Sequence, residues 1–157
     1  RTEAVISNIH GVVNMHMLRT RKSGADAFAD VHIQVPPNVS VSEGHQIAEA
    51  VRHAIIQEID EITDVTVHTD PEDDAVAKPC NHLPLRGELL ETLEKQWGNL
   101  EITKQLDRVN THYLNGKIHL ELFLPLNIAT THADEIQQLK SLTQSHPDIE
   151  KVDIFYY

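Results

Sequence analysis

Apolar and polar residues alternate along three stretches in the first half of the chain, the pattern of half-buried β-strands. The stretches are residues 13–17, 28–35 and 65–69. The polar segment Arg19–Asp26 is predicted to connect the first two strands. Apolar residues at helical spacing predict one helix over Thr2–Ile9 and another that begins at Ser40, where Ser40 and Glu43 have the spacing of a capping box. The predicted order is therefore α-β-β-α-β.

The second half of the chain repeats this order. The predicted elements are a helix over Leu85–Trp97, strands over Leu106–Tyr113 and Lys117–Leu124, a helix capped by Thr131, and a strand over Ile149–Tyr156. Asn115-Gly116 is a strong signal for a tight hairpin between the two middle strands. The similar segments Val35–Val39 and Leu124–Ile128 fall at the same strand-to-helix corner, which indicates a tandem duplication.

Two such units predict an α+β fold class, with tandem α-β-β-α-β units of the ferredoxin-like (metallochaperone-like) type. Each unit has a three-stranded mixed sheet with two helices on one face, because the β-α-β crossover makes the last strand parallel to the second. The predicted boundaries are a first domain over 1–70, an acidic, proline-containing linker over 71–84, and a second domain over 85–157.

The composition of the chain narrows the range of possible functions and partners. The 157 residues are 40% hydrophobic and carry a formal net charge of −11, so we expect no nucleic acid partner. A single cysteine excludes an internal disulfide and fits a reducing compartment. No apolar run approaches the ~18–20 residues that span a bilayer, and we expect no signal peptide. Because the chain begins with Arg1, we expect it to be a piece of a longer protein.

Eleven histidines are an unusual number for a chain of this length. His16, His32 and His68 fall on the predicted strands opposite the apolar residues, and Asp70 projects beside His68 from the same face. His45 lies in the first turn of the predicted helix. Imidazole and carboxylate together bind divalent metals, so we predict a metal site made of these five residues.

The donor set favours zinc, with iron, cobalt, manganese or cadmium as alternatives. Four histidines and one aspartate exceed one tetrahedral site unless some lie outside the coordination sphere. They suffice for two ions if Asp70 bridges them. The sequence leaves this division open.

The segments that carry these residues resemble the C-terminal cytoplasmic domain of cation diffusion facilitators, transporters that export zinc, iron and similar ions in exchange for protons. They are His16–Gly24, Phe28–Ile33, Ser42–His45 and Val65–Pro71. The resemblance implies a homodimer that binds metal at its interface through the five predicted ligands. It also implies a transmembrane domain in the same polypeptide, absent here, a place on the cytoplasmic side of the plasma membrane, and neither catalysis nor a small-molecule substrate.

The sequence departs from that family in two places. Met17 stands where the family often has an acidic residue, and a whole second unit follows where the family's tails usually end. Two other functions stay open: a free-standing metal buffer or sensor, and a two-metal hydrolase with a bridging carboxylate.

The second unit lacks the central pair of the predicted site. Alignment at the corners places Glu121 opposite His32, with these other proposed matches: His112 near His16, Asp134 or His132 near His45, and Phe155 and Tyr157 at the places of His68 and Asp70. We therefore predict a degenerate, structural copy. The alternative is a weaker site that uses His112, His119, Glu121 and His132. Cys80 and His82 in the linker form a pair that we interpret as incidental.

Overall fold

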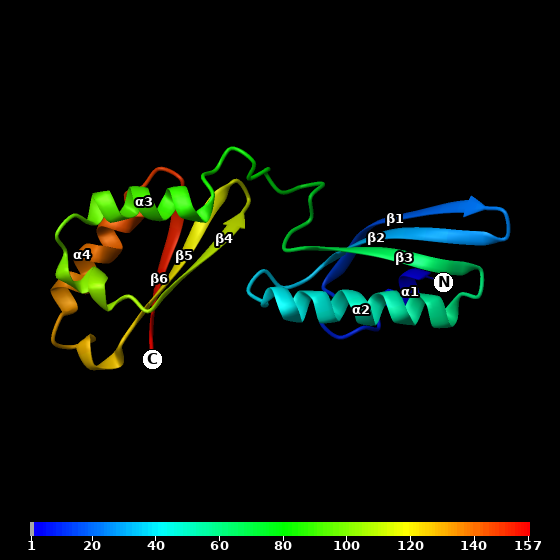
Figure 1. Cartoon of the computed structure of the whole chain (residues 1–157), viewed down its shortest axis with the longest axis horizontal. Coiled ribbons are helices and arrows are strands. Elements are labelled where there is room, and N and C mark those ends of the chain that lie inside the picture. Colours follow the sequence, from blue (N-terminus) through cyan, green and yellow to red (C-terminus); the bar gives the residue numbers. More distant parts are fainter. Residues whose placement is uncertain (1) are drawn as a thin grey trace. The chain divides into compact units, whose positions relative to one another are not determined.

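The computed structural model describes residues 2–157 and contains two compact units that divide between Ala77 and Lys78. Both units have the order α-β-β-α-β (Figure 1). The first contains α1 (Thr2–Ile6), β1 (Asn14–Ser23), β2 (Asp26–Gln34), α2 (Val41–Glu58) and β3 (Ile62–Asp70). The second contains α3 (Arg86–Trp97), β4 (Arg108–Leu114), β5 (Lys117–Leu124), α4 (Ala133–Gln144) and β6 (Ile149–Tyr156), with short 3-10 helices at Glu101–Gln105 and Leu126–Ile128.

Each unit is built on a three-stranded mixed sheet. The strand orders are β1-β2-β3 and β4-β5-β6, and in each sheet the first pair is antiparallel and the second pair is parallel. The parallel pair follows from the helical crossover that joins its strands. The predicted α+β fold class, with tandem units and mixed sheets, is confirmed.

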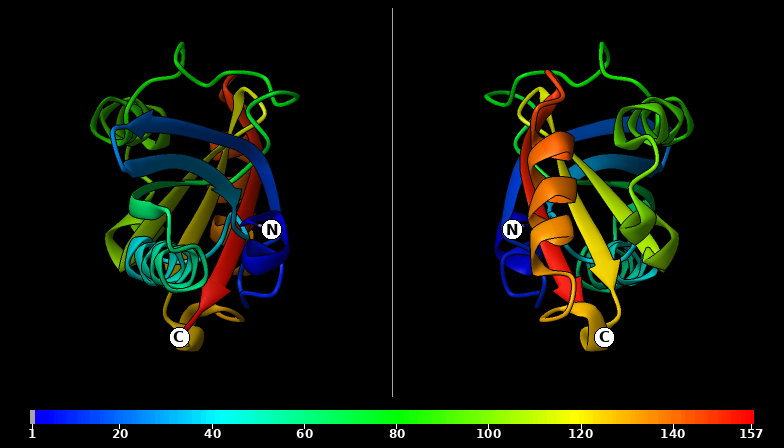
Figure 2. Two further views of the ribbon diagram at one scale, coloured as in Figure 1. Left: turned by 90° about the vertical axis from the view of Figure 1, so that its right-hand side faces the viewer. Right: turned by 90° about the vertical axis from the view of Figure 1, so that its left-hand side faces the viewer.

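Apolar side chains on one face of each sheet pack against the helices of the same unit. The right-hand view of Figure 2 shows helix α4 lying beside the strands of the second sheet. In the first unit these side chains come from α1, β2, α2 and β3, and they include Ile6, Val31, Ile33, Val51, Ile55 and Val65. The polar residues between them on the strands therefore lie on the other face, where the candidate site is built.

Helix α2 begins where its sequence predicts. Ser40 is the N-cap, and its hydroxyl oxygen accepts a hydrogen bond from the backbone N–H of Glu43 at 3.1 Å. This bond satisfies one of the N–H groups that have no partner within the helix. The cap fixes where the helix starts and thus which of its faces, that of Ile47, Val51 and Ile55, reaches the sheet.

The first hairpin differs from the prediction. The polar segment Arg19–Ser23 continues β1 rather than forming a loop, and the turn itself is confined to Gly24 and Ala25. Cross-strand partners explain the difference, because Arg19 pairs with Asp30 and the long strand stays paired to its end. Helix α1 is also shorter than predicted and ends at Ile6.

Two features require glycine at position 11, after α1: the backbone conformation and the lack of space for a side chain. Its φ is +95°, and a Cβ added to it would lie 2.6 Å from Cδ1 and 2.9 Å from Cγ1 of the buried Ile47. Gly24 has a φ of +66°, but a Cβ added to it would meet no atom within 4 Å. The two glycines thus separate the cost of a left-handed backbone from the cost of a clash.

We expect Gly11→Ala to destabilise the first unit more than Gly24→Ala does. Both changes carry the left-handed penalty of about 1 kcal/mol, and Gly11→Ala adds overpacking against Ile47, which costs about 1–3 kcal/mol. Urea unfolding followed by circular dichroism measures the difference. Equal midpoints for the two variants would contradict the close approach of Gly11 to α2.

The second unit follows its predicted elements closely. Asn115 and Gly116 both have positive φ values, +49° and +75°, as a two-residue hairpin turn of the primed type needs. The predicted cap at Thr131 is wrong: α4 starts one residue later, with His132 as N-cap, and the Thr131 hydroxyl lies 2.8 Å from Nδ1 of His132.

None of the helices within residues 2–157 combines the length and the apolar character that crossing a bilayer requires.

Candidate metal centre

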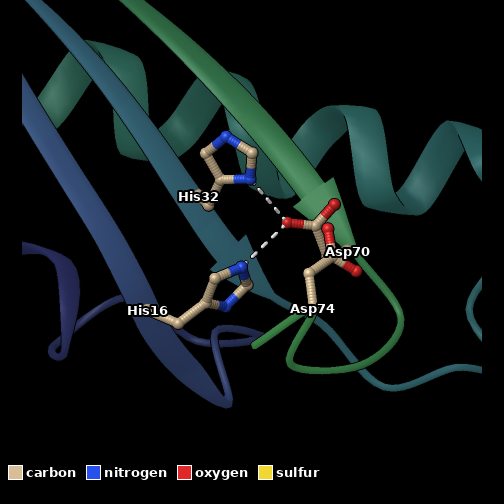
Figure 3. A group of neighbouring side chains, drawn as sticks. All are labelled: His16, His32, Asp70 and Asp74. Carbon is tan, nitrogen blue, oxygen red and sulfur yellow. Dashed lines mark hydrogen bonds and ion pairs between the residues drawn. The ribbon is translucent and has the colours of Figure 1, made fainter. Parts of the chain in front are cut away.

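Two histidines converge on one carboxylate oxygen on the polar face of the first sheet (Figure 3). Nε2 of His16 lies 3.1 Å from Oδ2 of Asp70, and Nδ1 of His32 lies 2.9 Å from the same atom. In a tetrahedral site with bonds of ~2.0–2.1 Å, neighbouring ligand atoms are about 3.3 Å apart. Each imidazole nitrogen therefore already lies near the shared oxygen at about the spacing of two ligands of one ion.

His16 is the least exposed of the three side chains, at 7%, against 17% for Asp70 and 21% for His32. Both of its ring nitrogens are buried, and neither makes a hydrogen bond; Nε2 approaches Asp70 at an angle outside hydrogen-bond geometry. A buried polar atom without a partner costs about 1–3 kcal/mol. A metal ion bound at Nε2 would remove part of that cost.

A β-bulge in β1 places His16 on this face. Met15 pairs with Ile33 and Met17 pairs with His32, so His16 is the extra residue between them. The bulge also corrects the predicted alternation: Met17 lies opposite His32 on the polar side, and Leu18, opposite Val31, packs against the core instead. Bulges redirect side chains in this way and recur next to functional sites.

Register in the parallel pair brings the other residues together. His32 of β2 lies beside His68 of β3, and Gln34 lies beside Asp70. The rings of His32 and His68 are stacked, with centroids 4.4 Å apart and planes 14° apart. His68 thus supports the ring of His32 from an exposed position on the same face.

Asp74 completes the group, and the sequence analysis missed it. One ligand atom from each of His16, His32, Asp70 and Asp74 lies within 4.8 Å of the others. Asp74 follows the end of β3 in a turn where the side chain of Asp73 accepts a hydrogen bond from the N–H of Ala75 at 2.9 Å. The only sequence signal for Asp74 as a ligand was the acidic composition of residues 72–74. This composition does not indicate which of the three carboxylates reaches the site.

The structure does not place every predicted ligand at this group. Among residues 2–157, the clustered ligand atoms come from four side chains, and His68 and His45 are not among them. His45 is exposed in the first turn of α2. The two imidazoles and two carboxylates that do converge are a donor set that fits a borderline divalent ion such as Zn²⁺.

Comparison with known proteins identifies the family of the first unit. Residues 1–72 match the sequence model of a family described as "Cation efflux protein, cytoplasmic domain". The first unit is a cation efflux cytoplasmic domain. Domains of this kind are the cytoplasmic parts of membrane transporters. Three of the four clustered residues, His16, His32 and Asp70, lie within the matched segment, and Asp74 lies just beyond it.

Two curated proteins are similar to this chain over different shares of its length. Metal tolerance protein C1 from Arabidopsis thaliana is 27% identical over 169 residues, which covers 95% of this chain and 35% of that protein. The cation-efflux pump FieF from Salmonella schwarzengrund (strain CVM19633) is 31% identical over 87 residues, which covers 55% of this chain and 26% of that protein. The chain thus spans about a third or less of the length of these relatives.

Among solved structures, the cation efflux domain is similar to MamM-CTD. One MamM-CTD structure is 31% identical and covers 45% of this chain and 90% of that one, with a TM-score of 0.44. A variant described as a manganese form is 33% identical, covers 46% and 91% of the two chains, and has a TM-score of 0.44.

The second unit differs from the cation efflux domain at the corresponding positions. The ladders of β5 and β6 set Asp153 beside Glu121 and Phe155 beside Phe123. The predicted match was therefore wrong by two residues: Asp153, not Phe155, stands at the place of His68, and Phe155, not Tyr157, stands at that of Asp70. The predicted match of His112 with His16 is also wrong, because His112 pairs with His119, as Arg19 pairs with Asp30.

Aromatic and paired side chains occupy that face of the second unit. The rings of Phe123 and Phe155 stack with centroids 5.3 Å apart, and the guanidinium of Arg108 lies 4.1 Å from the centre of the Phe123 ring. Nε2 of His112 lies 3.3 Å from Oε1 of Glu121. Among residues 78–157, all of them described, no group like that of the first unit forms.

Cys80 belongs to the packing of the second unit. Its Sγ accepts a hydrogen bond from the N–H of Gly116 at 3.3 Å, and the side chain packs against the second core. This contact gives Cys80 a structural role that needs no metal.

Proposed function

We propose that the chain is the metal-sensing and dimerisation region of a divalent cation efflux transporter. It binds metal through the predicted His16, His32, His45, His68 and Asp70, together with Asp74, and acts by binding rather than by catalysis. Zinc is the first candidate ion, followed by iron, cobalt, manganese and cadmium. The proposed partners are a second copy of the chain and a transmembrane domain of the same polypeptide. The names of the relatives, a metal tolerance protein and a cation-efflux pump, support this proposal.

The observation that carries the proposal is the buried imidazole of His16, which makes no hydrogen bond and lies beside a carboxylate that it shares with His32. Burying such a ring is unfavourable unless a ligand meets it. Asp70 places a negative oxygen within 3.1 Å of it, and His32 adds a second imidazole at 2.9 Å from that oxygen. A divalent cation is the ligand that accepts an electron pair from all three atoms at once.

His45 and His68 are the ligands that we assign to the dimer. Both are exposed in one chain, and the helices within residues 2–77 contribute side chains to the core on the opposite, apolar face of the sheet. A second copy that covers this face brings its own imidazoles toward the site. Because the ion then binds the dimer better than the monomer, it favours dimerisation by mass action. An ion at 100 times its dissociation constant contributes about 2.7 kcal/mol.

The second unit is proposed to be a degenerate copy with a structural role. At the place of Asp70 it has Phe155, stacked on Phe123, and hydrocarbon cannot ligate a metal. Its acidic residues on that face are engaged with basic or amide groups, as in the pairs of Glu121 with Asn110 and of Asp153 with Lys151. We therefore assign metal sensing to the first unit.

The test is zinc-dependent association of the intact chain. We expect zinc to tighten the dimer measured by sedimentation velocity, and His45→Ala to weaken this tightening by about tenfold, the lower end of the effect of losing one supporting contact at a metal site. His53→Ala is the matched control, because His53 is an exposed histidine of the same helix that contacts only Gln57 by hydrogen bond. Equal zinc responses in the two variants would remove His45 from the site. Zinc binding without any change in association would refute the dimer proposal.

A further inference from the structure

Asp74 differs from the other clustered residues because it lies outside the sheet. His16, His32 and Asp70 are held by three paired strands, whereas Asp74 is carried by the turn that leads out of the first unit. That turn is closed by local hydrogen bonds from the N–H groups of Val76 and Ala77 to the carbonyl oxygen of Asp73, at 3.0 and 2.9 Å. The Asp74 side chain points from this turn toward the cluster (Figure 3).

A few residues after Asp74, the chain begins to make the contacts of the second unit. The N–H of Lys78 donates a hydrogen bond to Oδ1 of Asn115 at 3.1 Å, and Leu83 is buried in the second core. Residues 75–77 are therefore what remains between Asp74 and the first hydrogen bond to the second unit. A ligand that fixes Asp74 fixes the beginning of this connection.

Two observations indicate that a cation belongs between Asp74 and the sheet. Asp70 and Asp74 bring two carboxylates close together, and like charges repel unless a positive charge lies between them. Independently, the His16 ring is more than nine-tenths buried, and its Nε2, which makes no hydrogen bond, points into the same group.

We propose that a divalent metal bound by His16, His32 and Asp70 also takes Asp74 as a ligand, and so ties the connection at residues 71–77 to the first unit. This inference rests on the function proposed above. Without metal, the exposed Asp74 carboxylate lacks this tie to the sheet. With metal, the freedom of the second unit is limited to residues 75–77. Metal occupancy of the first unit thereby controls the motion of the second.

Hydrogen exchange of the intact chain, measured by mass spectrometry with and without zinc, tests the tie. We expect zinc to slow exchange at the ends of β2 and β3 and also at residues 75–77. In Asp74→Asn the slowing at residues 75–77 is lost, while zinc still binds the sheet with an affinity about tenfold weaker. Asp73→Asn is the matched control: it removes the same charge one residue earlier, keeps the side-chain oxygen that accepts from Ala75, and retains the slowing.

The outcomes separate this inference from the proposed function. Slowing at β2 and β3 that leaves residues 75–77 unchanged, or full slowing in Asp74→Asn, would overturn the tie and leave the metal site standing. No zinc-dependent slowing at either place would overturn both.

The single tryptophan, Trp97, gives a second readout because it lies in the second unit. We expect zinc to reduce the amplitude of the fast, segmental component of its time-resolved fluorescence anisotropy in the wild type and in Asp73→Asn, but not in Asp74→Asn. An unchanged amplitude in the zinc-loaded wild type would show that the second unit moves independently of the metal, contrary to the inference.

Discussion

Asp70→Asn is expected to weaken zinc binding by more than about 100-fold. Oδ2 of Asp70 lies 3.1 Å from His16 and 2.9 Å from His32. The substitution removes the negative charge that faces both imidazoles and one of the two oxygens that an ion could use. Loss of a supporting residue alone costs about 10–100-fold at metal sites, and loss of a shared ligand exceeds that range. Isothermal titration of the intact chain with zinc measures the change.

Asp64→Asn is the control for that experiment. Asp64 lies on the same strand, is exposed, and contacts Arg52 at 3.3 Å rather than the cluster. The substitution makes the same change in net charge, and we expect zinc affinity to stay within about threefold of the wild type because the contribution of an exposed ion pair is small. If Asp70→Asn bound zinc as Asp64→Asn does, the site would have to lie elsewhere in the chain.

Local signals predict most of the fold because they act over a few residues. Alternation along Lys117–Leu124, the hairpin at Asn115-Gly116 and the cap at Ser40 each depend on neighbours in sequence, and the structure has all three. The hairpin of the first unit was harder to predict. Polar residues from Arg19 to Ser23 are typical of a loop, but their partners on β2 make them a strand, and a local pattern does not contain those partners.

The candidate site, too, depends on contacts that a local sequence pattern does not contain. The outward phase of His32 and Asp70 follows from alternation, whereas His16 reaches this face and contacts Asp70 through a bulge that simple alternation does not contain. Asp74 depends on a turn that no periodic pattern describes. His45 was predicted from its place in the first turn of the helix, but the group that converges in one chain does not include it, and its proposed role depends on a second copy of the chain.

The last strand of the second unit shows why register is difficult to predict across a long connection. The similar strand-to-helix corners align the sequence of β5 with that of β2. The match of Glu121 with His32 therefore depends only on residues close to the corner. Strand β6 has no such anchor, because α4 and its flanking turns differ in length from α2 and its turns. Backbone pairing removes the ambiguity and places Asp153 and Phe155 at the positions of His68 and Asp70.

Trp97→Ala is expected to destabilise the second unit by about 3–5 kcal/mol and to leave zinc binding unchanged. Trp97 is 6% exposed in the second core, and its indole N–H donates a hydrogen bond to Oγ1 of the fully buried Thr143 at 2.9 Å. The substitution leaves a large cavity and removes a buried donor, and domains have only about 5–15 kcal/mol of stability to lose. Differential scanning calorimetry would show the unfolding temperature of that unit falling by more than about 10 °C.

Thr143→Val separates the two parts of this effect. Valine keeps the shape of threonine and removes the hydroxyl, which accepts from Trp97 and donates to the carbonyl oxygen of Leu139 at 2.7 Å. The indole N–H is then left without this partner, and the expected cost is about 1–3 kcal/mol. In both variants zinc should still raise the unfolding temperature of the first unit, because the four clustered ligands all come from residues 16–74. If zinc binding disappeared when the second unit unfolds, that unit would contribute to the site. The proposal that the first unit senses metal and the second is a structural copy would then be wrong.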